Sequence, residues 1–123
     1  MERPRVLVVE DEALLGLVLG EVLEDLGYEV CAIVATQVDA VEAAQRCRPD
    51  LMIVDVRLRT GSGIAAMAQI CRSGFIPHVF TTGDIAEVIA LRPDAIAIQK
   101  PFAEAELSRA IQRTLAAARR PDA

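Results

Sequence analysis

The chain has 123 residues, a length typical of one domain, and 53% of them are hydrophobic, which is enough to bury a substantial core. Its formal net charge is −5 and its 13 lysines and arginines are scattered, which argues against direct binding of nucleic acid or of an anionic membrane surface. The first apolar run, residues 6–9, is too short for a signal peptide or a membrane span, so we expect a cytoplasmic protein without membrane contact.

Five short apolar runs alternate with segments of helical periodicity. The runs are residues 6–9, 30–34, 51–54, 79–81 and 95–98. This alternation predicts an α/β fold with a doubly wound, five-stranded parallel sheet and helices on both faces. Such βα units account for the whole chain, so we predict a single domain over 1–123, with a core of about 5–118 and a frayed tail at 119–123.

Capping and stop signals mark the helices between these runs. Thr36, followed by Asp39, has the spacing of a capping box that begins the second helix, and Asp84 is the expected N-cap of a short fourth helix. Gly27 is expected to end the first helix. The apolar face of the first helix is predicted at Leu15, Val18, Leu19, Val22, Leu23 and Leu26, and that of the second at Val38, Val41 and Ala44.

Polar side chains stand where four of the predicted strands end. Glu10 and Asp11 follow the first, Asp55 ends the third, Thr82 ends the fourth and Lys100 follows the fifth. Because the carboxyl ends of parallel strands line one crevice, these residues are expected to share a site. Clustered carboxylates repel one another unless a cation neutralises them, and hard oxygen ligands suit Mg²⁺, so the three acids are a candidate Mg²⁺ site.

This set of groups suits phosphoryl transfer. Asp55 could attack a phosphoryl donor in line and form a transient aspartyl phosphate. Lys100 would offset the phosphoryl charge, and Thr82 would donate a hydrogen bond to a phosphoryl oxygen. The same residues could serve a small Mg²⁺-dependent phosphohydrolase with an aspartyl-phosphate intermediate. Such enzymes use a second acid two residues after the nucleophile, and that position holds Arg57.

Four segments, in order and across almost the full chain, resemble the receiver domains of two-component response regulators. They are residues 6–12, 53–58, 77–83 and 100–102, which read VLVVEDE, IVDVRL, PHVFTTG and KPF. The resemblance implies the flavodoxin-like strand order 2-1-3-4-5. It also implies a signalling protein rather than an enzyme, in which a sensor histidine kinase or a histidine phosphotransfer protein donates the phosphoryl group and an unidentified protein receives the signal.

The resemblance assigns roles to individual residues. Asp55 matches the phospho-acceptor, Thr82 the hydroxyl position and Lys100 the lysine of the family. Glu10 and Asp11 match the acidic pair, with Asp11 the direct ligand of Mg²⁺ and the backbone carbonyl of Arg57 completing the metal shell. Lys100 and Pro101 would be joined by a cis peptide bond, which an X-Pro pair can accommodate.

Three features depart from the usual receiver pattern. Glu10 stands where many members have Asp, so the side chain is longer by one methylene group and the charge is the same. Ala97 occupies the position, three before the lysine, where many receivers place an aromatic residue that reports phosphorylation. The short stretch 82–100 and the segment 80–83 are similar to compact single-domain receivers with a Phe-x-Thr-Gly motif.

Two outputs are compatible with a stand-alone receiver. The phosphorylated domain could bind a partner protein, or it could act as a phosphate sink that drains a shared kinase.

Several other residues have plainer interpretations. The cysteines Cys31, Cys47 and Cys71 lack metal-ligand spacing and are expected to be buried reduced thiols. His78 is expected at the surface. Arg57 and Asp84 flank the site, and they are either modulators of dephosphorylation, an ion pair or ordinary loop charges.

Overall fold

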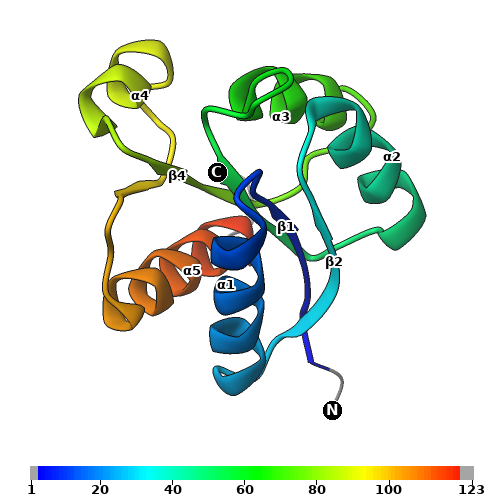
Figure 1. Cartoon of the computed structure of the whole chain (residues 1–123), viewed down its shortest axis with the longest axis vertical. Helices are drawn as coiled ribbons and strands as arrows, with labels where there is room; N and C mark the ends of the chain where they lie inside the picture. Colours follow the sequence, from blue (N-terminus) through cyan, green and yellow to red (C-terminus); the bar gives the residue numbers. More distant parts are fainter. Residues whose placement is uncertain (1–2, 120–123) are drawn as a thin grey trace.

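The computed structural model describes residues 3–119. Five parallel strands form one sheet in the order β2-β1-β3-β4-β5, which confirms the predicted order (Figure 1). The strands are β1 (Arg5–Val9), β2 (Glu29–Val34), β3 (Leu51–Asp55), β4 (His78–Thr82) and β5 (Ala97–Gln99). β3 lies at the centre and all five of its residues are buried.

The helices cover both faces of the sheet, as expected. They are α1 (Ala13–Asp25), α2 (Gln37–Cys47), α3 (Gly63–Cys71), α4 (Ile85–Leu91) and α5 (Glu104–Arg119). Alternate residues of β1 point to opposite faces: Leu7 joins a core with α2, α3 and α4, whereas Val8 joins one with α1 and α5. α5 extends through Arg119, and residues 120–123 of the predicted frayed tail lie outside the described residues.

Local signals in the sequence place most helix ends correctly. The Thr36 hydroxyl accepts a hydrogen bond from the Asp39 amide at 3.1 Å, and Asp84 accepts one from the Glu87 amide at 3.3 Å, so both predicted N-caps are confirmed. Gly27 follows α1 with a φ of 99°, the left-handed conformation predicted for it.

The predicted apolar faces of α1 and α2 are partly wrong. Val18 is 48% exposed and Val38 is 73% exposed. On α1 the buried stripe includes Gly16 and Gly20, where an added Cβ would lie 3.0 and 3.1 Å from the Ile33 side chain. The helix can approach β2 closely because these positions lack side chains, and the rotation that buries them turns Val18 outward.

His78 is buried, so the predicted surface position is wrong. β4 begins at this residue, which pairs with Met52 of β3, and the imidazole lies between two aromatic rings. Its ring centroid is 5.8 Å from that of Phe75 and 5.1 Å from that of Phe80. Burial lowers the pKa of His78, and Nδ1 lies 2.7 Å from the carbonyl oxygen of Ile76.

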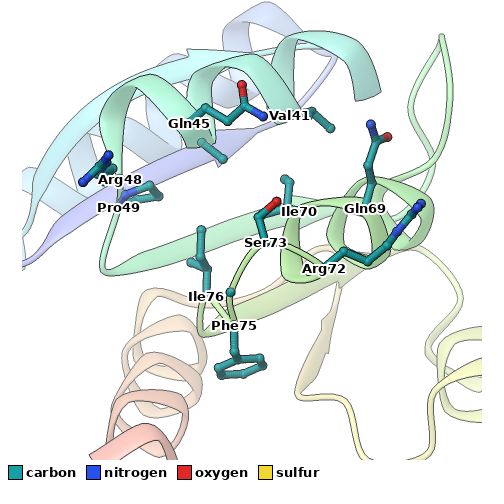
Figure 2. A pocket seen from close by; sticks show the side chains of 12 residues that line it. Val41, Gln45, Arg48, Pro49, Gln69, Ile70, Arg72, Ser73, Phe75 and Ile76 are labelled. Atoms are coloured by element: carbon teal, nitrogen blue, oxygen red, sulfur yellow. The ribbon is translucent and has the colours of Figure 1, made fainter.

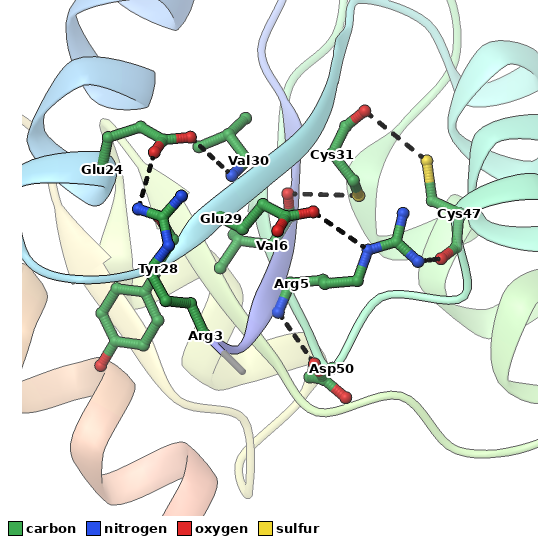
Figure 3. Close-up of polar contacts among 10 residues, drawn as sticks. All are labelled: Arg3, Arg5, Val6, Glu24, Tyr28, Glu29, Val30, Cys31, Cys47 and Asp50. Atoms are coloured by element: carbon green, nitrogen blue, oxygen red, sulfur yellow. Dashed lines mark hydrogen bonds and ion pairs between the residues drawn. The ribbon is translucent and has the colours of Figure 1, made fainter. Parts of the chain in front are cut away.

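The amino edge of the sheet, opposite Asp55, holds a groove between α2 and α3 (Figure 2). Beside it, polar contacts tie the first strand to its neighbours (Figure 3). The Arg5 amide donates to Asp50 at 2.8 Å, and its guanidinium donates to the Cys47 carbonyl and pairs with Glu29 at 3.6 Å. All three cysteines are free thiols, of which Cys47 is buried and the other two are half-buried, so the burial predicted for all three is only partly correct. None of the described helices is long and apolar enough to cross a membrane.

Candidate functional site

Three carboxylates meet at the carboxyl edge of the sheet. Glu10 and Asp11 follow β1, and Asp55 is the last residue of the neighbouring β3. One carboxylate oxygen from each of the three lies within 4.8 Å of the others, as the sequence predicts. The side chains of Glu10 and Asp55 are almost completely buried, whereas Asp11 is partly exposed. The fold therefore holds the acids together at one partly solvated point.

Lys100 joins two of these acids. Its Nζ donates to Asp55 Oδ2 at 2.9 Å and to Glu10 Oε1 at 3.0 Å, although the three residues lie on separate segments of the chain. The Lys100 amide donates to the Thr82 carbonyl at 2.7 Å and continues the pairing of β5 with β4. The bond between Lys100 and Pro101 is cis, as the resemblance implies.

The two remaining Asp55 and Glu10 oxygens face backbone donors. Asp55 Oδ1 accepts from the Arg57 amide at 3.3 Å, and Glu10 Oε2 accepts from the Glu12 amide at 3.1 Å. Each carboxylate is thus held between Lys100 and the loop that follows its own strand. This arrangement fixes the orientation of both side chains before any ligand binds.

Burial and pairing compete in setting the pKa values of the site. Burial raises the pKa of Glu10, and the hydrogen bonds from Lys100 and the Glu12 amide offset this only in part. Burial by itself would lower the pKa of Lys100, but its hydrogen bonds to Asp55 and Glu10 outweigh that effect and leave the pKa raised. Lys100 therefore remains a cation at neutral pH, where it offsets the charge of the acids.

Thr82 lies at the same edge, at the end of β4 beside β3 and β5. Its side chain is buried, and the hydroxyl oxygen accepts a hydrogen bond from the Asp84 amide at 2.9 Å. The hydroxyl thus orients the turn into α4. Because Thr81 pairs with Asp55 in the sheet, Thr82 stands one residue further along its strand than the carboxylate does.

Of the alternatives left open for Arg57 and Asp84, an ion pair between the two is not observed. Arg57 forms an ion pair with Glu87 of α4 at 2.7 Å rather than with Asp84, whose carboxylate caps α4 instead. Neither the contact of Glu87 with Arg57 nor that of the Glu12 amide with Glu10 is among the features predicted from the sequence. Glu87 carries a local signal, since it is three residues after the N-cap, but its pairing with Arg57 depends on how β3 and β4 align.

The donor set suits a hard divalent cation. Three carboxylate oxygens from Glu10, Asp11 and Asp55 match the oxygen ligands that Mg²⁺ takes, and Asp11 offers an accessible carboxylate. Lys100 pairs with two of the three acids but carries a single positive charge, so the cluster keeps excess negative charge. The arrangement can therefore bind a cation and present Asp55 to a phosphoryl group.

Comparison with known proteins identifies the same fold and family. The family model for the response regulator receiver domain matches residues 6–112. The chain is 35% identical over 112 residues to the transcriptional regulatory protein PdtaR of Mycobacterium tuberculosis, covering 88% of this chain and 55% of PdtaR. It is 33% identical over 114 residues to the phyllosphere-induced regulator PhyR of Methylorubrum extorquens, covering 89% of this chain and 43% of PhyR. The chain thus spans about half the length of these relatives.

The solved structures agree with this assignment. The receiver domain of the response regulator PhyR from Erythrobacter litoralis superposes with a TM-score of 0.87 at 28% identity, covering 100% of this chain and 98% of that one. The PhyR response regulator of Brucella abortus also gives a TM-score of 0.87, at 26% identity, and there 95% of this chain matches 49% of the other. The chain therefore belongs to the family of response regulator receiver domains.

Proposed function

We propose that the protein accepts a phosphoryl group on Asp55 within a histidine-to-aspartate phosphorelay. The observation that carries the proposal is the position of Lys100 Nζ, which lies within 3.0 Å of both Asp55 and Glu10. A half-buried cation at this point prepares the site for an anionic group that arrives at Asp55. Membership of the receiver family supports the same role.

In this proposal one carboxylate oxygen of Asp55 attacks the phosphorus of the donor. The new oxygen–phosphorus bond forms as the bond to the leaving group breaks, and the donor departs with that electron pair. Lys100 would transfer its hydrogen bond from Asp55 to a phosphoryl oxygen. The Thr82 hydroxyl, which accepts a hydrogen bond from the Asp84 amide, would donate a hydrogen bond to a second phosphoryl oxygen.

We assign the Mg²⁺ site to Asp11, Glu10, Asp55 and the backbone carbonyl of Arg57. The bound cation would neutralise charge on the acids and on the transferred group. Within the acidic pair, Asp11 is the direct ligand in this assignment because its carboxylate is partly exposed, whereas both Glu10 oxygens already accept hydrogen bonds.

The proposed phosphodonor is a sensor histidine kinase or a histidine phosphotransfer protein in the cytoplasm. Free thiols support a reducing compartment. The output is then either binding of a downstream protein or drainage of phosphate from the kinase. A partner captured from a lysate by the beryllofluoride-treated protein, and not by the untreated one, favours the first output. A kinase that loses its phosphate to this protein without any such partner favours the second.

Phosphorylation tests the assignment directly. The wild type, incubated with radiolabelled acetyl phosphate and Mg²⁺, should acquire a label that hydroxylamine releases, as an acyl phosphate requires. Asp55→Asn should acquire none and keep its fold, because the amide is nearly isosteric but cannot attack. Asp25→Asn, at the far end of α1, is the matched control and should label normally.

Three results would contradict the proposal. They are a hydroxylamine-sensitive label on Asp55→Asn, a wild type that acquires none from acetyl phosphate or from a panel of purified histidine kinases, and sustained turnover of p-nitrophenyl phosphate. The last result would instead indicate the phosphohydrolase, which the sequence disfavours because Arg57 stands where that enzyme needs an acid and here pairs with Glu87.

A further inference from the structure

A groove of about 640 Å³ opens at the amino edge of the sheet, far from Asp55 (Figure 2). It lies between the carboxyl-terminal halves of α2 and α3 and reaches the loops that lead into β3 and β4. Its volume falls in the range of about 300–1,000 Å³ that ligand sites occupy. The site proposed above uses none of the residues that line it.

The floor of the groove is apolar. Val41 and Ala44 come from α2, Ile70 comes from α3 and Ile76 precedes β4. These four side chains belong to, or pack on, the core cluster on that face of the sheet, so the floor is a firm surface. The nearby Phe75 is 68% exposed. A binding partner could therefore cover apolar area here without requiring the groove to rearrange.

The charge of the groove is opposite to that of the chain. Two cations, Arg48 and Arg72, line it, and no Asp or Glu does so among the described residues. Within residues 3–119 neither arginine has a carboxylate within 4.0 Å. Figure 2 shows them on opposite sides of the floor, one where α2 ends and one where α3 ends.

Both arginines cap a helix at its carboxyl end, a position that by itself favours a cation. The preference of helix ends for cations explains each arginine separately, but it does not explain why both line the same apolar groove. The chain has a net charge of −5, but the two arginines at this groove would attract an acidic partner.

We propose that this groove binds a short acidic segment of a partner protein, with one apolar side chain on the floor and carboxylates against Arg48 and Arg72. Charge complementarity sets the class of partner, and the open groove between two helices suits an extended segment. Since the groove and Asp55 lie at opposite edges of the sheet, the partner and a phosphodonor can bind together.

A peptide pool tests this proposal. The probe is a fluorescein-labelled pool of peptides of about seven residues, with a central Leu, Ile or Phe flanked by Asp and Glu. A matched pool carries Lys in place of the acids. Fluorescence polarisation measures affinity for the full chain, and two-dimensional amide NMR locates the contacts. The acidic pool should bind, weaken as salt rises and shift the amides of Val41, Arg48, Arg72 and Ile76, whereas the lysine pool should not bind.

Charge-removing variants provide the decisive comparison. Arg48→Gln and Arg72→Gln should each weaken binding about three- to fivefold, the upper part of the range for an exposed ion pair, and the double variant should weaken it further. Arg46→Gln is the matched control, because Arg46 lies on α2, pairs with Glu42 and does not line the groove. It should bind like the wild type. Circular dichroism establishes that all variants fold.

Several outcomes would overturn the proposal. One is equal binding of the acidic pool to the wild type and the double variant, and another is amide shifts confined to other surfaces. No binding of the acidic pool, or equal binding of the lysine pool, would do so as well. If dodecanoate shifts the same amides and no peptide binds, the groove would instead be assigned to a small anion with an apolar chain.

Discussion

A Cβ atom added at Gly63 would lie 2.1 Å from the backbone carbonyl oxygen of Asp55. α3 therefore begins in direct contact with the strand end that carries the proposed phospho-acceptor. The Gly63 amide reinforces the contact by donating to the Val56 carbonyl at 2.9 Å. Any side chain at this position must displace either the helix or the end of β3.

We predict that Gly63→Ala destabilises the domain by about 1–3 kcal/mol, the usual cost of overpacking. Helix propensity alone would favour alanine by about 1 kcal/mol, so a net loss isolates the steric effect. Urea unfolding measures it. Gly83→Ala is the control, since an added Cβ there meets nothing within 4 Å. Equal stability of the Gly63→Ala variant and the wild type would contradict the steric argument.

The sequence predicts the sheet, and the proximity of the candidate site residues, because both follow from short-range patterns and strand order. A buried run that ends in an acid, as residues 51–55 do, indicates a strand and its polar end at once. Strand order then brings Glu10, Asp11, Asp55 and Lys100 together.

The errors concern contacts between elements that are distant in sequence. Val18 is exposed because Gly16 and Gly20 let α1 rotate against Ile33, and helical periodicity alone does not show that preference. The partner of Arg57 is Glu87, thirty residues away, which no local spacing indicates. His78 is buried because it pairs with Met52 of the central strand β3, and this pairing is not evident from the local sequence.

Lys100→Met should leave two nearly buried carboxylates without their cation. Removing one member of a fully buried pair costs about 3–5 kcal/mol, and the 22% exposure of the Lys100 side chain reduces our expectation to about 2 kcal/mol. Combining it with Asp55→Asn should recover part of the loss, because the second change removes one stranded charge. A double-mutant cycle by urea unfolding measures the coupling, and additive losses would contradict the pairing.

The acidic pair should divide its roles in binding metal. Asp11→Ala should weaken Mg²⁺ binding more than Glu10→Ala does, because both Glu10 oxygens already accept hydrogen bonds from Lys100 and the Glu12 amide. Calorimetric titration of Mg²⁺ compares the two variants with Glu21→Ala, a control on α1 outside the site. Unimpaired binding in both site variants would exclude the acidic pair as the ligand set.

The raised pKa of Glu10 predicts how stability responds to pH. A carboxyl whose pKa is higher in the folded state binds its proton more tightly there, so its favourable contribution to stability is present at low pH and is lost as pH rises through the folded pKa. Burial is the main cause of the raised pKa. At a pH above 4.5, the ordinary pKa of a glutamate, the ionised form of Glu10 therefore lowers the stability of the folded state. Without divalent cations, Glu10→Gln should be more stable than the wild type at neutral pH and lose that advantage in acid. Urea unfolding across pH tests the sign, and an advantage that grows in acid would contradict it.

Residues 83–93, which include α4, should be the most mobile part of the described chain and the part that phosphorylation orders. Val88 is buried in α4, whereas Ile89 and Leu91 are 53% and 61% exposed, so little apolar burial holds the helix. The ion pair between Arg57 and Glu87 is largely exposed and contributes little stability. Ala97 provides no aromatic side chain whose rotation could report phosphorylation.

The signal would then pass through Thr82, whose hydroxyl now accepts from the Asp84 amide at the start of α4. A phosphoryl group on Asp55 would draw that hydroxyl toward itself and reposition the loop, an order–disorder change in a segment of low stability. When Mg²⁺ and beryllofluoride are added, amide hydrogen exchange should therefore slow over residues 83–93, whereas the exchange rates in α2 should stay unchanged. Thr82→Ala should bind the mimic without this slowing, because it lacks the hydroxyl that links the two. Slow exchange over 83–93 in the untreated protein, with no response to the mimic, would show that α4 is a fixed part of the fold.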